Sequence, residues 1–247
     1  MCFRYSITQK AQLLNQVVSL RWTLDFEPVF HANGFEFPLM PVITSQEPDQ
    51  VQAYHWGLIP HWAPSMAEAQ KLRAQTLNAK SETVFEKPAF RSYIPKRRCL
   101  ALSDGFFEWM DFNKKKYPHY VQAADGGIFA FAGIYSHWTE PETGELFRTF
   151  SILTTAANPM MARIHNSKER MPVILAPEQW EAWLDPDLTK EQVQELMRPC
   201  SESFLKAHTI DRALARPGFD ANHAATLQQV HYPELDSPAE QASLFGG

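Results

Sequence analysis

The middle of the chain carries the stretch CLALSDGFFEWM at residues 99–110. It begins with an apolar run and continues, after Asp104-Gly105, with a second run that is rich in aromatic residues. Short apolar runs separated by an Asp-Gly pair are typical of β-strands that meet at a turn or bulge. The stretch therefore predicts β-structure on both sides of a turn or bulge.

The flanking segments continue this pattern. We expect further strands at residues 2–7, 51–59, 117–123, 128–135, 147–155, 171–175 and about 207–211, with strand pieces and loop over 26–48. The Asp125-Gly126-Gly127 turn predicts a hairpin between two of them. Short helices are expected after Thr8, Ser65, Ser81, Pro177 and Thr189, which are typical residues at helix starts. Together these elements predict an α+β fold, predominantly β, with a curled or barrel-like β core and short peripheral helices.

Length and charge limit the class of protein. The 247 residues suffice for one large domain, which we place at 1–232, followed by a polar, flexible tail at 233–247. The net charge of −5 argues against a protein that coats nucleic acid through bulk charge, but it permits a local basic groove. The lysine run at 114–116 is interpreted as a solvated turn or strand end.

The sequence also indicates a compartment. No apolar run approaches the ~20 residues of a membrane span, and no signal peptide is recognisable, so we expect a cytoplasmic protein. The three cysteines are few and far apart, and they form neither a disulfide framework nor a metal-binding spacing. We therefore expect no metal site. We also expect that the protein uses no cofactor and is a monomer.

Cys2 directly follows Met1. Methionine aminopeptidases act best when the second residue is small, so Cys2 could become the first residue of the mature chain. An N-terminal cysteine carries an α-amine titrating near pH ~8 and a thiol titrating near ~8.5. Together they can condense with an aldehyde to a Schiff base and close it to a thiazolidine ring. On position alone, Cys2 could instead be a buried thiol that acts as a small hydrophobic residue.

Three other residues are candidates for chemistry, and each has a structural alternative. Strand alternation places Glu108 on one face with Phe106 and Met110, where burial would raise its pKa and suit it to proton transfer. Glu108 could instead face solvent at a strand end. His165 could be a structural hydrogen-bonding residue, and Asn78 a helix C-cap or turn residue.

These candidates lie in five motifs: MCFR at 1–4, WGLIPHW at 56–62, NAKSET at 78–83, DGFFEW at 104–109, and IH at 164–165 with RMPVIL at 170–175. Their order and spacing, from residue 1 to about 232, resemble the SOS-response-associated peptidase family. Members of this family crosslink themselves to abasic sites in single-stranded DNA. The resemblance implies the family fold, with a role in DNA repair and the SOS response to DNA damage.

The resemblance also implies residue roles. After loss of Met1, Cys2 would form a thiazolidine with the ring-opened sugar, and Asn78 would orient its α-amine. Glu108 would transfer protons during formation and reversal of this DNA–protein crosslink, a lyase-like reaction, and His165 would assist opening of the sugar ring. Phosphates or bases of the DNA would be held by Arg4, Trp62, Lys80, Thr154 and Arg170.

The chain departs from the family pattern at three places. Phe3 stands where the family usually has glycine, so a side chain lies next to the expected nucleophile. Lys80 replaces an arginine, which removes bidentate phosphate binding. The segment 165–172, HNSKERMP, is longer than the compact family form, so the position of Arg170 relative to DNA is open.

Two alternative functions are considered. The first is a cysteine peptidase that uses Cys2 and His165 on peptide bonds, as the family name suggests, including hydrolytic removal of its own Met1. The second is a non-catalytic module that binds single-stranded DNA or modified bases.

The tail contains QASLF at residues 241–245. This resembles the peptide that binds bacterial sliding clamps. Leu244 and Phe245 would fill an apolar pocket and Gln241 would hydrogen-bond at its rim. The alternative is a polar C-terminus without a partner.

Overall fold

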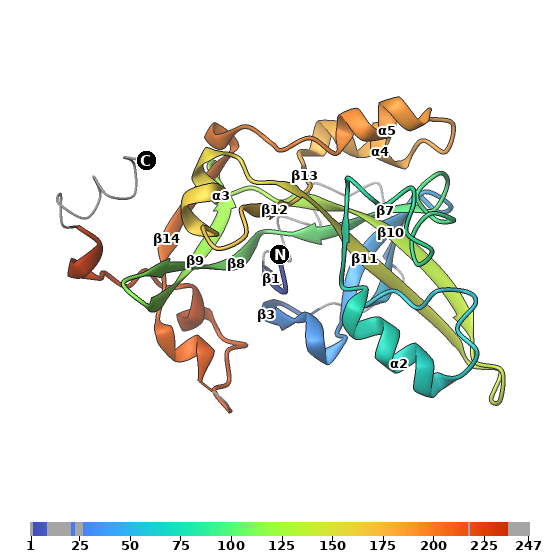
Figure 1. Cartoon of the computed structure of the whole chain (residues 1–247), viewed down its shortest axis with the longest axis horizontal. Coiled ribbons are helices and arrows are strands. Elements are labelled where there is room, and N and C mark those ends of the chain that lie inside the picture. Colours follow the sequence, from blue (N-terminus) through green and yellow to red (C-terminus); the bar gives the residue numbers. More distant parts are fainter. Residues whose placement is uncertain (1, 9–20, 23–26, 217, 237–247) are drawn as a thin grey trace.

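The computed structural model describes residues 2–8, 21–22, 27–216 and 218–236 (Figure 1). Its strands form two sheets. The first sheet has the order β14-β9-β8-β1-β3 and consists of Leu205–Thr209, Lys115–Ala123, Gly105–Phe112, Arg4–Ile7 and Val29–Asn33. The second has the order β12-β11-β10-β7-β4-β5-β2 and consists of Arg170–Pro172, Leu146–Ala156, Phe129–Thr139, Arg98–Ser103, Leu39–Thr44, Gln50–Trp56 and Arg21–Trp22. The short strands β6 (Asn78–Lys80) and β13 (Ile174–Leu175) pair with β11 and β10.

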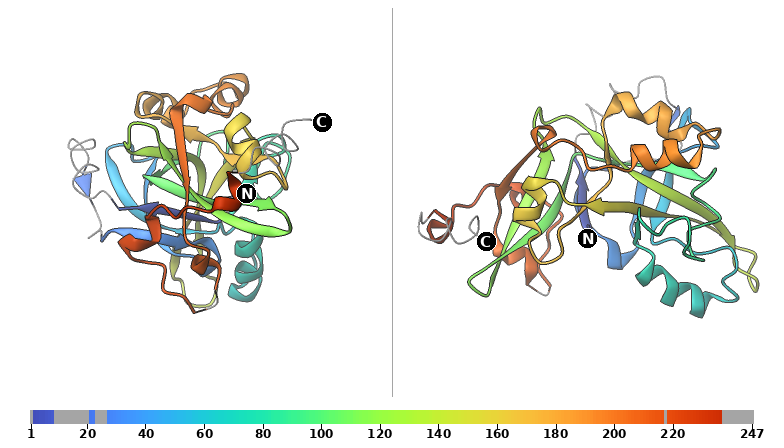
Figure 2. Two further views of the ribbon diagram at one scale, coloured as in Figure 1. Left: turned by 90° about the vertical axis from the view of Figure 1, so that its left-hand side faces the viewer. Right: turned by 45° about the horizontal axis from the view of Figure 1, so that its top comes forward.

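Short helices surround the sheets. The α-helices are α2 (Met66–Gln75), α3 (Pro159–Ile164), α4 (Trp180–Leu184) and α5 (Lys190–Leu196). Helices α4 and α5 lie on the opposite side of the sheets from α2 (Figure 2). The 3-10 helices are Gly34–Glu36, Pro177–Gln179, Glu202–Phe204, Arg212–Ala215, Ala224–Leu227 and Pro233–Leu235. The predicted fold class, predominantly β with short peripheral helices, is confirmed. No helix in the described ranges is long and apolar enough to cross a membrane.

The two sheets share one apolar core, to which both contribute aromatic side chains. Tyr5 of β1 packs edge-on against Trp56 of β5, with ring centroids 5.0 Å apart. Tyr5 also contacts Phe131 of β10 at 5.3 Å. Edge-to-face contacts of this kind add about 0.5–1.5 kcal/mol each to the burial of the rings. The first strand of the chain is therefore anchored deep in the protein.

The stretch at residues 99–110 connects the two sheets. Strand β7 pairs with β4 and β10, whereas β8 pairs with β1 and β9, so the chain changes sheets at Asp104. Gly105 is required there because a Cβ atom would lie 2.2 Å from the hydroxyl of Tyr120. The Asp-Gly signal thus marks the corner at which the chain passes from one sheet to the other.

Three details of the sequence prediction differ from the structure. Residues 125–127 do form a turn, but β9 and β10 belong to different sheets, so the predicted hairpin is wrong. The helix expected after Ser81 is replaced by turns over residues 82–96, a segment that contains Pro88 and Pro95. Strand β5 ends at Trp56, because Gly57 adopts a φ of 103°. The helix predicted after Thr8 lies outside the described residues.

Asp104 holds the end of β1 in place. One carboxylate oxygen accepts a 2.6 Å hydrogen bond from the hydroxyl of Ser6. The other accepts 2.6 Å bonds from the backbone amide and the hydroxyl of Thr8. The Tyr120 hydroxyl lies 2.8 Å from that of Ser6 and completes the network. Asp104 and Ser6 are buried, so these hydrogen bonds satisfy polar groups that water cannot reach.

Replacing Asp104 by alanine should destabilise the fold. Because the buried hydroxyl of Ser6 and the partly buried amide and hydroxyl of Thr8 lose their charged acceptor, we expect the free energy of unfolding to fall by about 2–4 kcal/mol. Urea denaturation measures this change. The control is Asp187→Ala, at an exposed position, which should alter stability by no more than about 0.5 kcal/mol. Equal effects of the two substitutions would contradict this role of Asp104.

Candidate active site

Strand β1 places Cys2 in the interior. It pairs antiparallel with β8, Tyr5 opposite Phe106, and with β3 on its other side. A hydrogen bond from the Gly34 amide to the Phe3 carbonyl, at 2.9 Å, extends the pairing with β3 by one residue. Continued to the chain start, the β8 register sets Phe3 opposite Glu108. Cys2, with no exposed surface, therefore lies at the same end of the sheet as Glu108.

Asn78 binds the backbone of Cys2. It begins the short strand β6, which runs parallel to β11, with Asn78 opposite Ile152. Its side-chain Nδ2 donates a 2.8 Å hydrogen bond to the Cys2 carbonyl. Its Oδ1 is buried and accepts no hydrogen bond within the described part of the chain. The structure thus brings together two of the predicted site residues, 76 positions apart in sequence.

Glu108 is buried in β8, with 4% of its surface exposed, so the solvent-facing alternative is excluded. Strand alternation directs Phe106 into the main core and Phe107 into a separate cluster, as predicted. Burial raises the pKa of Glu108 from 4.5 to about 7. A carboxyl group with this pKa can both donate and accept a proton near neutral pH.

His165 follows α3 and faces Glu108. Its Nδ1 lies 2.8 Å from the carbonyl oxygen of Arg170, which can only accept, so Nδ1 carries a proton. Nε2 lies 3.9 Å from Oε2 of Glu108. Burial lowers the pKa of His165. The neutral imidazole therefore presents its unprotonated nitrogen towards Glu108.

The Cys2 thiol is held in its neutral form. Burial raises its pKa well above the ordinary range, and the negative charge of Glu108 raises it further. The thiol donates a weak hydrogen bond to the Arg4 carbonyl at 3.6 Å. A nucleophilic thiolate requires the opposite environment, with positive charge nearby. The environment of Cys2 therefore favours the neutral thiol over the thiolate.

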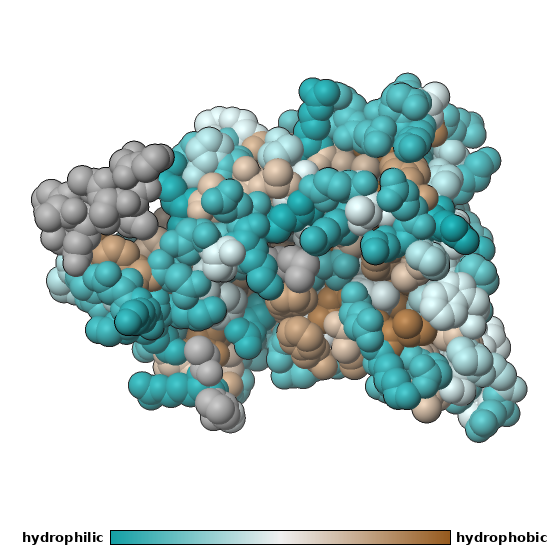
Figure 3. Space-filling model, viewed as in Figure 1, coloured by the Kyte–Doolittle hydropathy of each residue, from teal (hydrophilic) through white to brown (hydrophobic). Residues whose placement is uncertain are grey.

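A cavity of about 380 Å³ opens next to these groups. Its lining residues are Phe3, Arg4, Phe35, Glu108, Trp109, Lys116, His165, Ser167 and Lys168. Phe3 packs against Phe35 with ring centroids 5.0 Å apart, so the side chain next to Cys2 forms part of the wall. Figure 3 shows apolar surface on this face of the protein, near Gly34–Glu36, within a largely polar exterior. Phe35 is 53% exposed there.

The five residues predicted to bind DNA occupy different environments. Trp62 and Lys80 are exposed, and Arg4 is half-buried, with its guanidinium 4.8 Å from the Trp109 ring. Thr154 is fully buried. Arg170 forms an ion pair with Glu82 and donates to the Thr154 carbonyl at 2.7 Å. Thr154 and Arg170 are thus engaged inside the protein, and three residues remain accessible.

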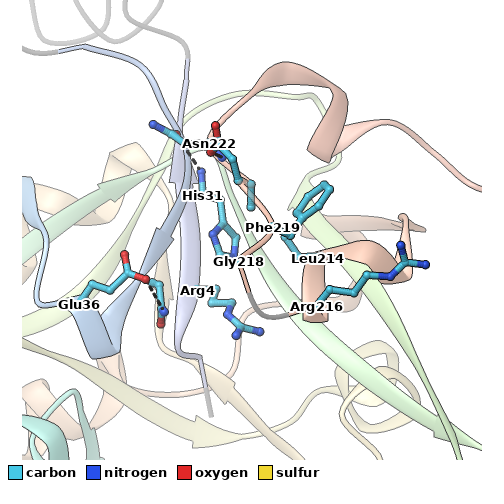
Figure 4. A pocket seen from close by; sticks show the side chains of 11 residues that line it. Arg4, His31, Glu36, Leu214, Arg216, Gly218, Phe219 and Asn222 are labelled. Carbon is cyan, nitrogen blue, oxygen red and sulfur yellow. Dashed lines mark hydrogen bonds between the residues drawn. The ribbon is translucent and has the colours of Figure 1, made fainter.

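A second cavity of about 430 Å³ lies on the other side of Arg4. His31 of β3 and Asn222 lie side by side in it, and Arg4 and Arg216 also line it (Figure 4). Burial lowers the pKa of His31 to about 4, so this imidazole is neutral. In the described ranges, no group of three or more His, Cys, Asp or Glu could hold a metal.

Several cavity residues were missed by sequence reasoning. Trp109, Phe35, Lys116, Ser167 and Lys168 line the space beside Glu108. The lysine run at 114–116 does form a turn and strand start, as interpreted. The register of β8 and β9, with Asp111 opposite Lys116, directs Lys116 back towards the cavity. A register for β8 and β9, set from the sequence by the turn that joins them, would have indicated that Lys116 lies near Glu108.

Comparison with known proteins identifies the family. Residues 1–217 match the family model described as SOS response associated peptidase (SRAP). The chain is 34% identical over 195 residues to "Abasic site processing protein YoqW" of Bacillus subtilis (strain 168), covering 78% of this chain and 82% of that protein. It is 34% identical over 150 residues to "Abasic site processing protein YMR114C" of Saccharomyces cerevisiae, covering 60% and 38% respectively.

Solved structures agree with this match. A crystal structure of a protein from Bacteroides thetaiotaomicron is 37% identical, with a TM-score of 0.87, covering 93% of this chain and all of the other. A protein from Bordetella bronchiseptica, at 22% identity and a TM-score of 0.73, shares the fold. The family model and the relatives span most of the chain. The chain therefore belongs to the SOS response associated peptidase family.

Proposed function

We propose that this protein processes abasic sites in single-stranded DNA, to which it links covalently through Cys2 after removal of Met1. The names of its relatives, which describe abasic site processing proteins, support the substrate class. The observation that carries the mechanism is the buried Glu108, which faces His165 and acts electrostatically on Cys2. The covalent link would shield the lesion during replication and the response to DNA damage.

The chemistry proceeds through two bond-forming steps. Removal of Met1 gives Cys2 a free α-amine beside its thiol. The amine attacks the aldehyde carbon of the ring-opened abasic sugar, and loss of one water leaves a Schiff base. The thiol then adds across the C=N bond, its sulfur to carbon and its proton to nitrogen, which closes a thiazolidine. Ring closure removes the iminium group that would otherwise promote β-elimination of the strand.

Three residues support these steps. The buried Oδ1 of Asn78 offers an acceptor to the new α-amine, next to the carbonyl that its Nδ2 already binds. Glu108, with a pKa of about 7, takes the proton of the attacking amine and returns it to the leaving hydroxyl. Nε2 of His165, unprotonated at rest, takes a proton from the Glu108 carboxyl that faces it and passes this proton to the ring oxygen of the sugar, while the anomeric hydroxyl returns one to Glu108. The same transfers in reverse release the DNA.

The peptidase alternative receives less support from the geometry. A Cys–His peptidase activates its thiol through the imidazole, with an activated thiolate as nucleophile. Here the group that faces Nε2 of His165 is the Glu108 carboxyl, and burial raises the pKa of the Cys2 thiol. Hydrolytic removal of Met1 by the protein itself needs only one turnover. A non-catalytic DNA-binding module would not need this buried acid–base pair.

Residues around the site would bind the DNA strand on both sides of the lesion. Exposed Trp62 and Lys80, with Arg4, would stack bases and hold phosphates of the single strand, while Arg170 and Thr154 support the groove from inside. We propose that a monomer acts on DNA in the cytoplasm and the nucleoid. We also propose that residues 1–232 form the domain and 233–247 a flexible tail that binds the sliding clamp.

A denaturing gel tests the covalent mechanism. The protein is mixed with a single-stranded oligonucleotide that carries one abasic site, and the wild type should give a shifted band that survives denaturation. Cys2→Ala should abolish this band, because the α-amine alone forms only a hydrolysable Schiff base. Cys2→Ser should give a band only after borohydride reduction, which traps the Schiff base. Cys200→Ala, distant in sequence and only partly buried, is the matched control and should crosslink normally.

A stable, unreduced crosslink formed by Cys2→Ala would contradict the mechanism. So would a wild-type protein, with Met1 removed according to its intact mass, that binds the oligonucleotide without any covalent band. Cleavage of peptides without a crosslink would support the peptidase alternative instead.

The raised pKa of Glu108 predicts a pH-dependent stability. Between its ordinary pKa of 4.5 and its folded-state pKa of about 7, the folded protein binds more protons than the unfolded chain. The contribution of Glu108 to stability therefore falls as pH rises through this window. Glu108→Gln should gain roughly 2–3 kcal/mol relative to wild type between about pH 4.5 and 8, measured by urea denaturation.

The control is Glu181→Gln, at an exposed position, whose stability difference from wild type should not vary with pH. A Glu108→Gln difference that stays constant across this range would show that the carboxyl titrates normally.

The tail provides a separate prediction. A labelled peptide of residues 236–247 should bind the bacterial sliding clamp, because Leu244 and Phe245 can fill an apolar pocket while Gln241 bonds at its rim. Fluorescence anisotropy measures the affinity. A peptide with alanine at Leu244 and Phe245 is the control. No binding of the unaltered peptide at high micromolar concentration would refute the clamp interaction.

A further inference from the structure

The extended loop that departs from the family pattern is clamped to β8. Asn166 makes two hydrogen bonds to the backbone of Asp111. Its Oδ1 accepts from the Asp111 amide at 3.0 Å, and its Nδ2 donates to the Asp111 carbonyl at 2.8 Å. The amide side chain thus takes the place of a neighbouring strand at this edge of β8.

The rest of the loop is a closed turn. The amides of Lys168 and Glu169 both donate to the carbonyl of His165, at 3.2 and 2.9 Å. Glu169 adopts a φ of 49°, a conformation that non-glycine residues rarely take. Its carbonyl accepts from the Ala157 amide at 2.9 Å, which ties the loop to the end of β11. Three backbone hydrogen bonds therefore hold the loop in this conformation.

The loop presents polar groups at the cavity. Ser167 and Lys168 are exposed and line it, and Lys116 of β9 lines it as well. Burial lowers the pKa of His165, and the positive charges of Lys168 and Lys116 lower it further, so both lysines act on the imidazole. Lys116 also lies 3.9 Å from Asp111, but both side chains are exposed and such pairs are weak.

The charge around this cavity is positive although the protein as a whole is negative. Arg4, Lys116 and Lys168 line it, and Glu108 is the one acidic residue among its described lining residues. Since Glu108 has a pKa of about 7, it is only partly ionised near neutral pH. The net charge of −5 is therefore compatible with a cationic opening directly over the site.

We propose that Lys116, Lys168 and Ser167 form a binding site for one backbone phosphate adjacent to the abasic sugar. This inference rests on the proposed function, because it assumes that the sugar lies between Glu108 and His165. A phosphate next to that sugar is a single anion with several acceptor oxygens. The ammonium group of Lys116 on β9, and the ammonium and hydroxyl groups of Lys168 and Ser167 on the loop, supply donors for these oxygens. Lysine binds phosphate as a point charge. The site would hold the lesion in register with Cys2.

The test uses an oligonucleotide that carries a tetrahydrofuran analogue of the abasic site, which has no aldehyde and cannot crosslink. Its affinity for the wild type is compared with that for the Lys116→Ala, Lys168→Ala double variant. The phosphate on each side of the analogue is then replaced in turn by an uncharged methylphosphonate. Lys115→Ala is the matched control, because strand alternation directs Lys115 to the opposite face from Lys116.

We expect the double variant to bind about tenfold more weakly, and one methylphosphonate to weaken the wild type by a similar factor. The double variant should bind the methylphosphonate oligonucleotide no more weakly than either change alone predicts, because both changes remove the same contact between lysine and phosphate. The Lys115→Ala protein should lose affinity for that methylphosphonate as the wild type does.

Additive losses at both methylphosphonate positions would overturn the phosphate site, and so would a double variant with unchanged affinity. These outcomes are separable from failure of the proposed function. Suppose that the wild type forms no crosslink with a true abasic site, but that the losses of affinity from the double variant and from the methylphosphonate are not additive. The phosphate site then stands and the covalent mechanism fails. If the wild type forms the crosslink but the two losses of affinity are additive, the covalent mechanism stands and the phosphate site fails.

Discussion

The pairing of β1 with β3 and β8 is the constraint on which the site depends. It carries the beginning of the chain into the core, where Tyr5 packs against Trp56 and Phe131. Because strand side chains alternate between faces, a slip of one residue would turn Cys2 away from Glu108. The buried bonds to Asp104 at one end of β1, and the bond from Asn78 to the Cys2 carbonyl at the other, resist such a slip.

The same burial controls the chemistry. It raises the pKa of Glu108 into the neutral range and keeps the Cys2 thiol protonated. Under the proposed mechanism, removal of Met1 places an ammonium group on Cys2 itself, which favours the thiolate. Cleavage of the bond between Met1 and Cys2 would thus free the α-amine and favour ionisation of the thiol.

Much of the fold and the site could be predicted from sequence, for identifiable reasons. The apolar runs and the Asp-Gly corner are local signals, and the strands at 98–112 follow from them. Strand partners are not local, so the turn at 125–127 wrongly suggested a hairpin. The positions of Asn78, Glu108 and His165 came from a family resemblance, since their proximity depends on pairings between β6 and β11 and between β1 and β8. Lys116 and Lys168 were missed because only the folded loop brings them to one cavity.

The central claim, that Cys2 forms a ring through both its amine and its sulfur, is tested most directly by counting thiols in the crosslinked product. A Schiff base and a thiazolidine have the same mass, but only the Schiff base leaves the Cys2 thiol free. The complex with abasic DNA is denatured, alkylated with iodoacetamide and weighed. The account predicts loss of Met1 and alkylation of Cys99 and Cys200 alone, out of the three cysteines. Alkylation of all three, or a crosslinked chain that retains Met1, would contradict it.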